Sequence, residues 1–167
     1  MKKNNFVVRY RTFFLIAVLF SGVLISCTEK DEDLVKPKTI TDIILQNDQF
    51  SILREIIKSV EMQDALRAGE VTLFAPSDAA FRKSGITAST IISQRDSAIS
   101  FVNNHIVKDY KQFSDLKTEN LKAVNNQILT VKKTADSTVT VNGALITTKN
   151  IKADNGVIHV VDAVLKK

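Results

Sequence analysis

The chain has 167 residues, of which 44% are hydrophobic, and carries 23 basic and 18 acidic side chains for a formal net charge of +5. This length suits one domain with a full core. Residues 1–26 hold four basic and no acidic side chains, so residues 27–167 keep 19 basic and 18 acidic ones, a net charge of +1. A nucleic-acid-binding domain needs a clustered basic face on the folded chain. A net charge of +1 for residues 27–167 therefore gives no reason to expect a nucleic-acid partner.

The first 26 residues have the pattern of a secretory signal peptide. Basic residues at positions 2, 3, 9 and 11 precede an apolar run from Thr12 to Ile25, which is too short for a spanning helix of ~20 residues. The run ends at Leu24-Ile25-Ser26-Cys27, which resembles the lipobox of bacterial lipoproteins. In that family the signal is cut before the cysteine, and the cysteine is acylated.

Cys27 is the only cysteine in the chain, so it has no partner for an internal disulfide. The lipobox resemblance implies that residues 1–26 are removed and that acyl chains on Cys27 anchor the protein in a membrane. The alternative is an ordinary free or buried thiol. The position of Cys27, where the apolar run stops, favours the anchor.

Residues 27–38 are predicted to form a flexible acidic tether, because they are charged and lack a periodic apolar pattern. Lys30-Asp31-Glu32 resembles the acidic export signal that moves some Gram-negative lipoproteins to the cell surface; the alternative is a solvated spacer. Thr28 is not the aspartate that retains lipoproteins at the inner membrane in well-known systems. We therefore expect an outer-membrane location, at the cell surface or on the periplasmic face.

Amphipathic helix is predicted from residue 39 to residue 69. Thr39 and Thr41 are candidates for an N-terminal cap, residues 48–60 repeat apolar side chains at helical spacing, and Gly69 is suited to end the segment. Such an apolar stripe is typical of a core rather than of a cofactor pocket, and no cofactor is expected.

The next segment predicts a buried strand, a turn and two helices. The strand covers residues 71–75 and is stopped by Pro76, after which Ser77 can cap a helix that turns Phe81 inward. A second helix is predicted over residues 94–104, leading into an apolar run that begins at His105.

The last third of the chain predicts strands. Alternating apolar residues occur around 128–131 and 139–141, and the dipeptides Asn142-Gly143 and Asn155-Gly156 both indicate hairpin turns, since these residue types tolerate positive φ. Helices precede strands along the chain, which indicates an α+β domain.

Two segments resemble the signatures of the fasciclin (FAS1) domain family. Residues 71–81 (VTLFAPSDAAF) resemble the first signature, and residues 155–165 (NGVIHVVDAVL) resemble the second. Between them, NNHIV at 103–107 with Tyr110 resembles a third family segment. The resemblance covers residues 39–167 and implies a wedge-like β-sandwich with flanking α-helices. The signature positions are expected to be mainly structural: Phe74, Ala75, Pro76, Ser77, Phe81, His105, Asn155, Gly156, His159 and Asp162.

No catalytic or metal-binding constellation is predicted. Both histidines lie in apolar runs that favour burial, and Asp162, three residues after His159, would face the other side of one strand. Serine-hydrolase, zinc-protease and phosphate-loop motifs are absent from the sequence. The chain is therefore expected to be a binding protein and not an enzyme.

The fasciclin resemblance implies adhesion. In some animal members a tyrosine–histidine pair has been tied to receptor binding, but Asn104 takes the place of that tyrosine here. We expect an adhesion or ligand-capture module at the bacterial surface, with a protein or polysaccharide ligand. The alternative is a periplasm-facing scaffold or accessory lipoprotein of an outer-membrane complex, for example in polysaccharide uptake. The absence of tryptophan argues against the aromatic platform usual in sugar-binding sites.

Overall fold

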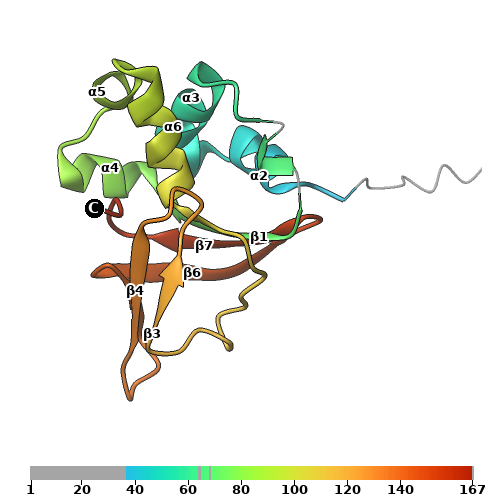
Figure 1. Cartoon of the computed structure of the whole chain (residues 1–167), viewed down its shortest axis with the longest axis vertical. Coiled ribbons are helices and arrows are strands. Elements are labelled where there is room, and N and C mark those ends of the chain that lie inside the picture. Colours follow the sequence, from blue (N-terminus) through green and yellow to red (C-terminus); the bar gives the residue numbers. More distant parts are fainter. Residues whose placement is uncertain (1–36, 64, 68, 167) are drawn as a thin grey trace, which may run out of the picture. The chain divides into compact units, whose positions relative to one another are not determined.

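A computed structural model of the chain describes residues 37–63, 65–67 and 69–166. The predicted signal peptide, Cys27 and most of the tether lie outside the described residues. Within them, helices lie above one side of a sheet, and most of the strands of this sheet come from the later part of the chain (Figure 1). The α+β class predicted from the order of elements is confirmed.

The first helical segment is broken into short pieces. Helix α2 spans Ile40–Gln46, the 3-10 turn η1 spans Asp48–Phe50, α3 spans Ser51–Ser59 and η2 spans Ala65–Arg67. The break occurs because extended Asn47 ends α2 and caps η1 with its own side chain. The helix predicted over 48–60 is therefore a 3-10 turn followed by α3.

Three further helices complete the helical layer: α4 (Asp78–Ser84), α5 (Ala88–Ile92) and α6 (Arg95–Asn104). Ser77 caps α4 as predicted, with its hydroxyl accepting from the Ala80 N–H at 3.3 Å. Asp78 begins α4 but bonds to α3, where it accepts from the Ser51 hydroxyl at 2.5 Å and the Ile52 N–H at 3.0 Å. One carboxylate thus fixes the N-terminus of α3 against α4.

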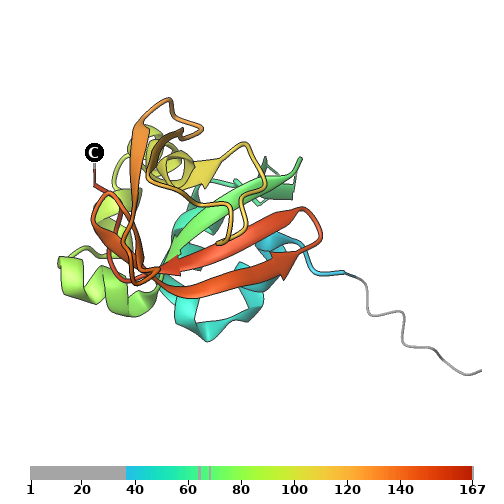
Figure 2. The same cartoon turned by 90° about the horizontal axis from the view of Figure 1, so that it is seen from below.

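The seven described strands form one bent sheet in the order β2-β1-β7-β6-β5-β4-β3. Strands β1 and β7 run parallel, and the other neighbours pair antiparallel. A bridge between Val107 and Ala123 brings the two ends of the sheet together (Figure 2), so the sheet is a nearly closed wedge. The strands are β1 Val71–Pro76, β2 Ile106–Val107, β3 Glu119–Lys122, β4 Ile128–Lys133, β5 Val139–Val141, β6 Ala144–Ala153 and β7 Gly156–Val161.

One predicted hairpin turn is present as expected and the other is displaced. Asn142 and Gly143 link β5 to β6 with φ of 49° and 83°. Between β6 and β7, however, Ala153 pairs with Gly156, so the turn residues are Asp154 and Asn155. Gly156 is instead the first residue of β7. Its lack of a side chain serves the packing of that strand and not the turn.

The apolar side chains form two clusters separated by the first and last strands. One lies between the helices and the sheet and includes Phe50, Phe81 and Ile158; the other lies inside the bent sheet and includes Phe74 and Leu129. Both faces of β1 and β7 are buried, so these two strands form the centre of the fold.

Candidate functional site

The two signature segments lie side by side as the parallel strands β1 and β7. Val71 pairs with Gly156 and Pro76 pairs with Val161, so the whole length of each strand is matched. Phe74 lies opposite His159, and their rings stack with centroids 5.8 Å apart. Segments that are far apart in the sequence thus form one buried unit.

The end of the first signature connects the sheet to the helices. Ala75 is fully buried, Pro76 is the last residue of β1, and the Ser77 N–H donates to the Val161 carbonyl at 3.4 Å. Phe81 is fully buried and packs its ring 5.9 Å from that of Phe101. These contacts give the segment a role in joining β1 to α4.

His105 is fully buried where α6 passes into β2. The Leu165 N–H donates to its Nε2 at 3.2 Å, so Nδ1 carries the proton and donates to the Phe101 carbonyl at 2.8 Å. Burial lowers the pKa of His105 to about 4, partly opposed by the bond to Phe101. The ring is neutral and ties α6 to the C-terminal segment.

His159 is also buried, and its two nitrogens also contact main chain. The Asn150 N–H donates to Nδ1 at 3.3 Å, and Nε2 lies 2.9 Å from the Lys111 carbonyl, to which it donates. Burial lowers the pKa of this ring as well, against an opposing effect of the Lys111 carbonyl. Neither histidine offers a free nitrogen to a substrate or a metal in this conformation.

Acidification from pH 6.5 to pH 4 is expected to lower the free energy of unfolding. In this window an unfolded histidine binds a proton and folded His105 does not, so stability rises with pH until about 6.5 and then levels off. The pKa of about 4, against 6.5 for an ordinary histidine, corresponds to a loss of about 3 kcal/mol when complete. The buried His159 acts in the same direction.

Urea denaturation between pH 4 and pH 8 measures this effect. His105→Gln, which cannot take up the proton, should show a shallower slope over the same range than the unchanged chain. A free energy of unfolding that stays constant from pH 4 to pH 7 in the unchanged chain would show that the histidines are not held neutral.

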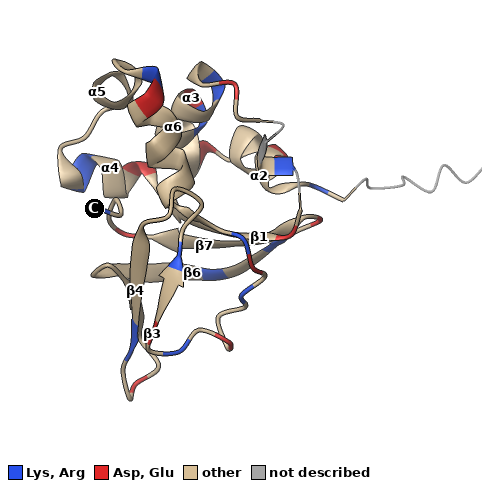
Figure 3. Cartoon of the chain, in the orientation of Figure 1, with Lys and Arg blue, Asp and Glu red and all other residues tan. Residues whose placement is uncertain are grey.

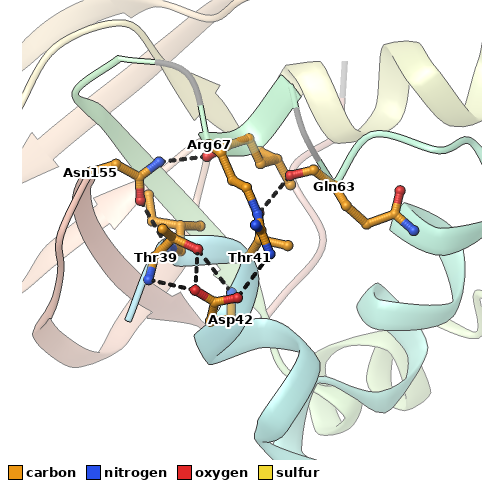
Figure 4. Close-up of polar contacts among 8 residues, drawn as sticks. Thr39, Thr41, Asp42, Gln63, Arg67 and Asn155 are labelled. Carbon is orange, nitrogen blue, oxygen red and sulfur yellow. Dashed lines mark hydrogen bonds and ion pairs between the residues drawn. The ribbon is translucent and has the colours of Figure 1, made fainter. Parts of the chain in front are cut away.

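Asn155 connects three parts of the fold (Figure 4). Its side-chain amide donates to the Leu66 carbonyl at 2.6 Å, and its Oδ1 accepts from the Ile40 N–H at 2.9 Å. Beside it, the Thr39 and Asp42 side chains cap α2 reciprocally, and Asp42 accepts from Arg67 at 3.0 Å. The Asn-Gly pattern predicts only a turn at Asn155 and indicates none of these long-range bonds.

Asp162 lies just after β7 and is engaged by two other elements. Its carboxylate accepts from the Leu145 N–H at 2.7 Å and from the Lys83 ammonium at 2.8 Å. The hydrogen bond from Lys83 is the main reason that the pKa of Asp162 lies below its ordinary value. Asp162 therefore joins β6 to α4 and does not act on His159.

The surface has several hollows of similar volume in the described part of the chain. One of about 450 Å³ lies between α5, α6 and the C-terminal segment, with Ile91, Phe101 and Leu165 in its lining. Another of about 440 Å³ lies where β2 and β3 diverge, and lysines and asparagines line much of it. Among residues 37–63, 65–67 and 69–166, no group of three or more His, Cys, Asp or Glu side chains is placed to hold a metal ion.

Comparison with known proteins agrees with this arrangement. A solved FAS1 domain pair from the insect cell adhesion molecule fasciclin I matches with a TM-score of 0.63 at 16% identity, over 78% of this chain and 51% of that one. The fold is therefore that of a FAS1 domain. A model of the fasciclin domain matches residues 48–167, and the chain belongs to the fasciclin domain family.

Two relatives illustrate the range of proteins that share this sequence pattern. Protein sll1483 of Synechocystis sp. is 30% identical over 131 residues, which make up 76% of this chain and 72% of that protein. A Plasmodium falciparum protein named heme ligase is 26% identical over 152 residues, 75% of this chain and 74% of that protein.

Proposed function

We propose that this chain is a lipid-anchored protein of the bacterial cell envelope whose fasciclin domain is an adhesion or ligand-capture module at the cell surface. The observation that carries the proposal is that both family signatures are used inside the fold, as buried strands and as links between sheet and helices. Recognition is then left to exposed side chains. The insect cell adhesion molecule with the same fold supports a binding role.

Binding is favoured over catalysis by the state of the titratable groups. Both histidine rings are buried and bonded to main chain through both nitrogens, so neither can serve as a general base without a rearrangement. The same geometry gives no reason to transfer the heme chemistry that the name of the Plasmodium relative indicates, since neither ring is open to an iron ion.

Cys27→Ser should move the protein from the membrane fraction to the soluble fraction without changing the melting temperature of the folded domain. Loss of the acylated thiol removes the proposed anchor, and Cys27 precedes the domain that the sequence predicts to begin at residue 39. Fractionation followed by immunoblotting measures the first effect, and thermal unfolding measures the second. Thr28→Ser is the matched control and should remain in the membrane fraction. Retention of Cys27→Ser in that fraction would contradict the anchor.

Protease treatment of intact cells tests the face of the membrane. Digestion of the chain without lysis supports exposure at the surface, where an adhesion module must lie. Protection from the protease, together with co-purification of an outer-membrane protein, would contradict the surface role and point to a scaffold that faces the periplasm.

A further inference from the structure

The antiparallel strands β3, β4 and β5 present one face to solvent. In β4 the side chains of Leu129 and Val131 are buried, and those of Ile128, Thr130 and Lys132 are exposed. Because side chains of paired residues lie on the same side of a sheet, the strand register extends this alternation to the neighbouring strands.

The register defines the members of this face row by row. Lys122 pairs with Ile128, Asn120 with Thr130, and Lys132 with Thr140. Thr140 in turn pairs with Leu145 at the start of β6. We call this set the outer sheet face: Asn120, Lys122, Ile128, Thr130, Lys132, Thr140 and Leu145.

The composition of the outer sheet face is unusual for this molecule. Ile128 is 53% exposed and Leu145 is 36% exposed, and these are the two large hydrophobic side chains that stand out as exposed among the described residues. Around them lie one amide, two hydroxyls and two ammonium groups, and no member of the face is acidic. In Figure 1, β3 and β4 extend into the lower part of the view, and the helices lie at the top.

The hollow between β2 and β3 adds cations at one edge of this face. Asn120 and Lys122 belong to its lining together with Lys108, Lys111 and one acidic residue, Asp109. Lys111 lies 3.4 Å from Asp109 and 3.9 Å from Glu119, whereas Lys108 and Lys122 form no ion pair with the described residues. In Figure 3, basic positions lie along β3, β4 and the segment after β2, with acidic positions among them.

We propose that the outer sheet face, with the adjoining hollow, binds an anionic polysaccharide. Ammonium groups pair with uronate carboxylates, amide and hydroxyl groups bond to sugar hydroxyls, and the aliphatic side chains of Ile128 and Leu145 pack on the apolar faces of the sugar rings. The setting at the cell surface rests on the proposed function. The binding itself does not.

Other occupants fit the same face less well. Protein interfaces concentrate their binding energy in tryptophan, tyrosine and arginine, and the face has none of these. Single-stranded nucleic acid needs aromatic rings on which bases stack. Recognition of anionic lipid typically takes a cluster of ~4–8 basic residues. The face carries two, and of the two lysines that the hollow adds, Lys111 is already paired with Asp109 and Glu119.

Binding to polygalacturonate, a polymer of uronic acid, tests the proposal, with neutral dextran as the comparison polymer. The chain, purified as the cell processes it, is measured by biolayer interferometry at low and high salt. Lys122→Gln with Lys132→Gln should weaken binding to polygalacturonate about tenfold, which is about 1.4 kcal/mol. Salt should weaken binding of the unchanged chain, because exposed charge pairs are screened.

The control removes the same charge from the helical layer. Lys58→Gln with Arg82→Gln changes two exposed basic residues on α3 and α4 and should leave binding unchanged. Equal loss in both double variants, equal binding to dextran, or no binding by the unchanged chain would overturn the proposal. Stronger binding to anionic vesicles or to DNA than to polygalacturonate would also overturn it.

This outcome is separable from that of the proposed function. A chain that binds polygalacturonate but is protected from protease in intact cells keeps the anionic-polysaccharide site and loses the surface location. A chain that is digested in intact cells but does not bind the polymer loses the site and keeps the surface location.

Discussion

Replacing Gly156 with alanine is expected to lower the free energy of unfolding by about 4 kcal/mol or more, or to prevent folding. A Cβ atom at this position would lie 2.0 Å from the Val71 carbonyl oxygen and 3.0 Å from Cδ1 of Ile40. The φ of 152° adds strain for any residue with a side chain. The cost is large because the clash is with main chain that has little room to move.

The neighbourhood of Gly156 explains why the clash cannot be relieved cheaply. Val71 is the first residue of β1, and its N–H donates to the Asn155 carbonyl. The turn that precedes Gly156 therefore also fixes the position of Val71. Ile40 is fully buried and bonded to the Asn155 side chain. Any shift of β1 would disturb the pairing along β7.

Gly143→Ala is the matched control for this experiment. Gly143 also has a positive φ, 83°, but nothing lies within 4 Å of a Cβ there, so the expected cost is about 1 kcal/mol from the backbone alone. Urea denaturation followed by circular dichroism measures both variants. If the two midpoints fell equally, backbone conformation and not close approach would be the reason for glycine at 156.

Phe74→Ala is expected to cost about 3–5 kcal/mol of unfolding free energy. The ring is 0% exposed and lies in the cluster inside the bent sheet, stacked on His159. Its removal leaves a cavity that the paired strands on both sides cannot collapse to fill. The measurement is the midpoint of urea unfolding, with near-UV spectra to confirm that the variant is folded at the start.

Phe113→Ala provides the comparison. This ring is half-buried and lies under the Lys149 ammonium, 3.9 Å from its centroid. Its loss should cost about 1–2 kcal/mol, since less apolar area is removed, together with the cation–π contacts to Lys149 and Lys133. A Phe74→Ala variant that unfolds at the same urea concentration as the unchanged chain would show that the first signature does not fill the core.

Local patterns in the sequence predicted the elements whose signals are local. The continuous apolar runs at 71–75 and 157–161 belong to strands buried on both faces, and Ser77 and Asn142-Gly143 have the conformations that their residue types favour. Helix α5 and strand β3 were not anticipated. Each is short, and β3 has a single inward apolar residue, Leu121, so neither shows a periodic pattern.

Long-range relations were beyond local patterns. The parallel pairing of β1 with β7, the reach of Asn155 to Leu66 and Ile40, and the close approach at Gly156 depend on residues far apart in the chain. The Asn-Gly dipeptide at 155–156 has the same letters as a hairpin turn, and the sequence alone cannot distinguish the two uses. The outer sheet face likewise appears only when the strand register is known.

The central strand pair also has a consequence for how the protein is made. Val71 must pair with Gly156, 85 positions later. The core therefore cannot be completed before β7 has left the ribosome, and the formation of contacts between such distant residues is slow. For the exported chain that we propose, this delay would favour the extended state that an export channel accepts, and folding would finish after passage through the membrane.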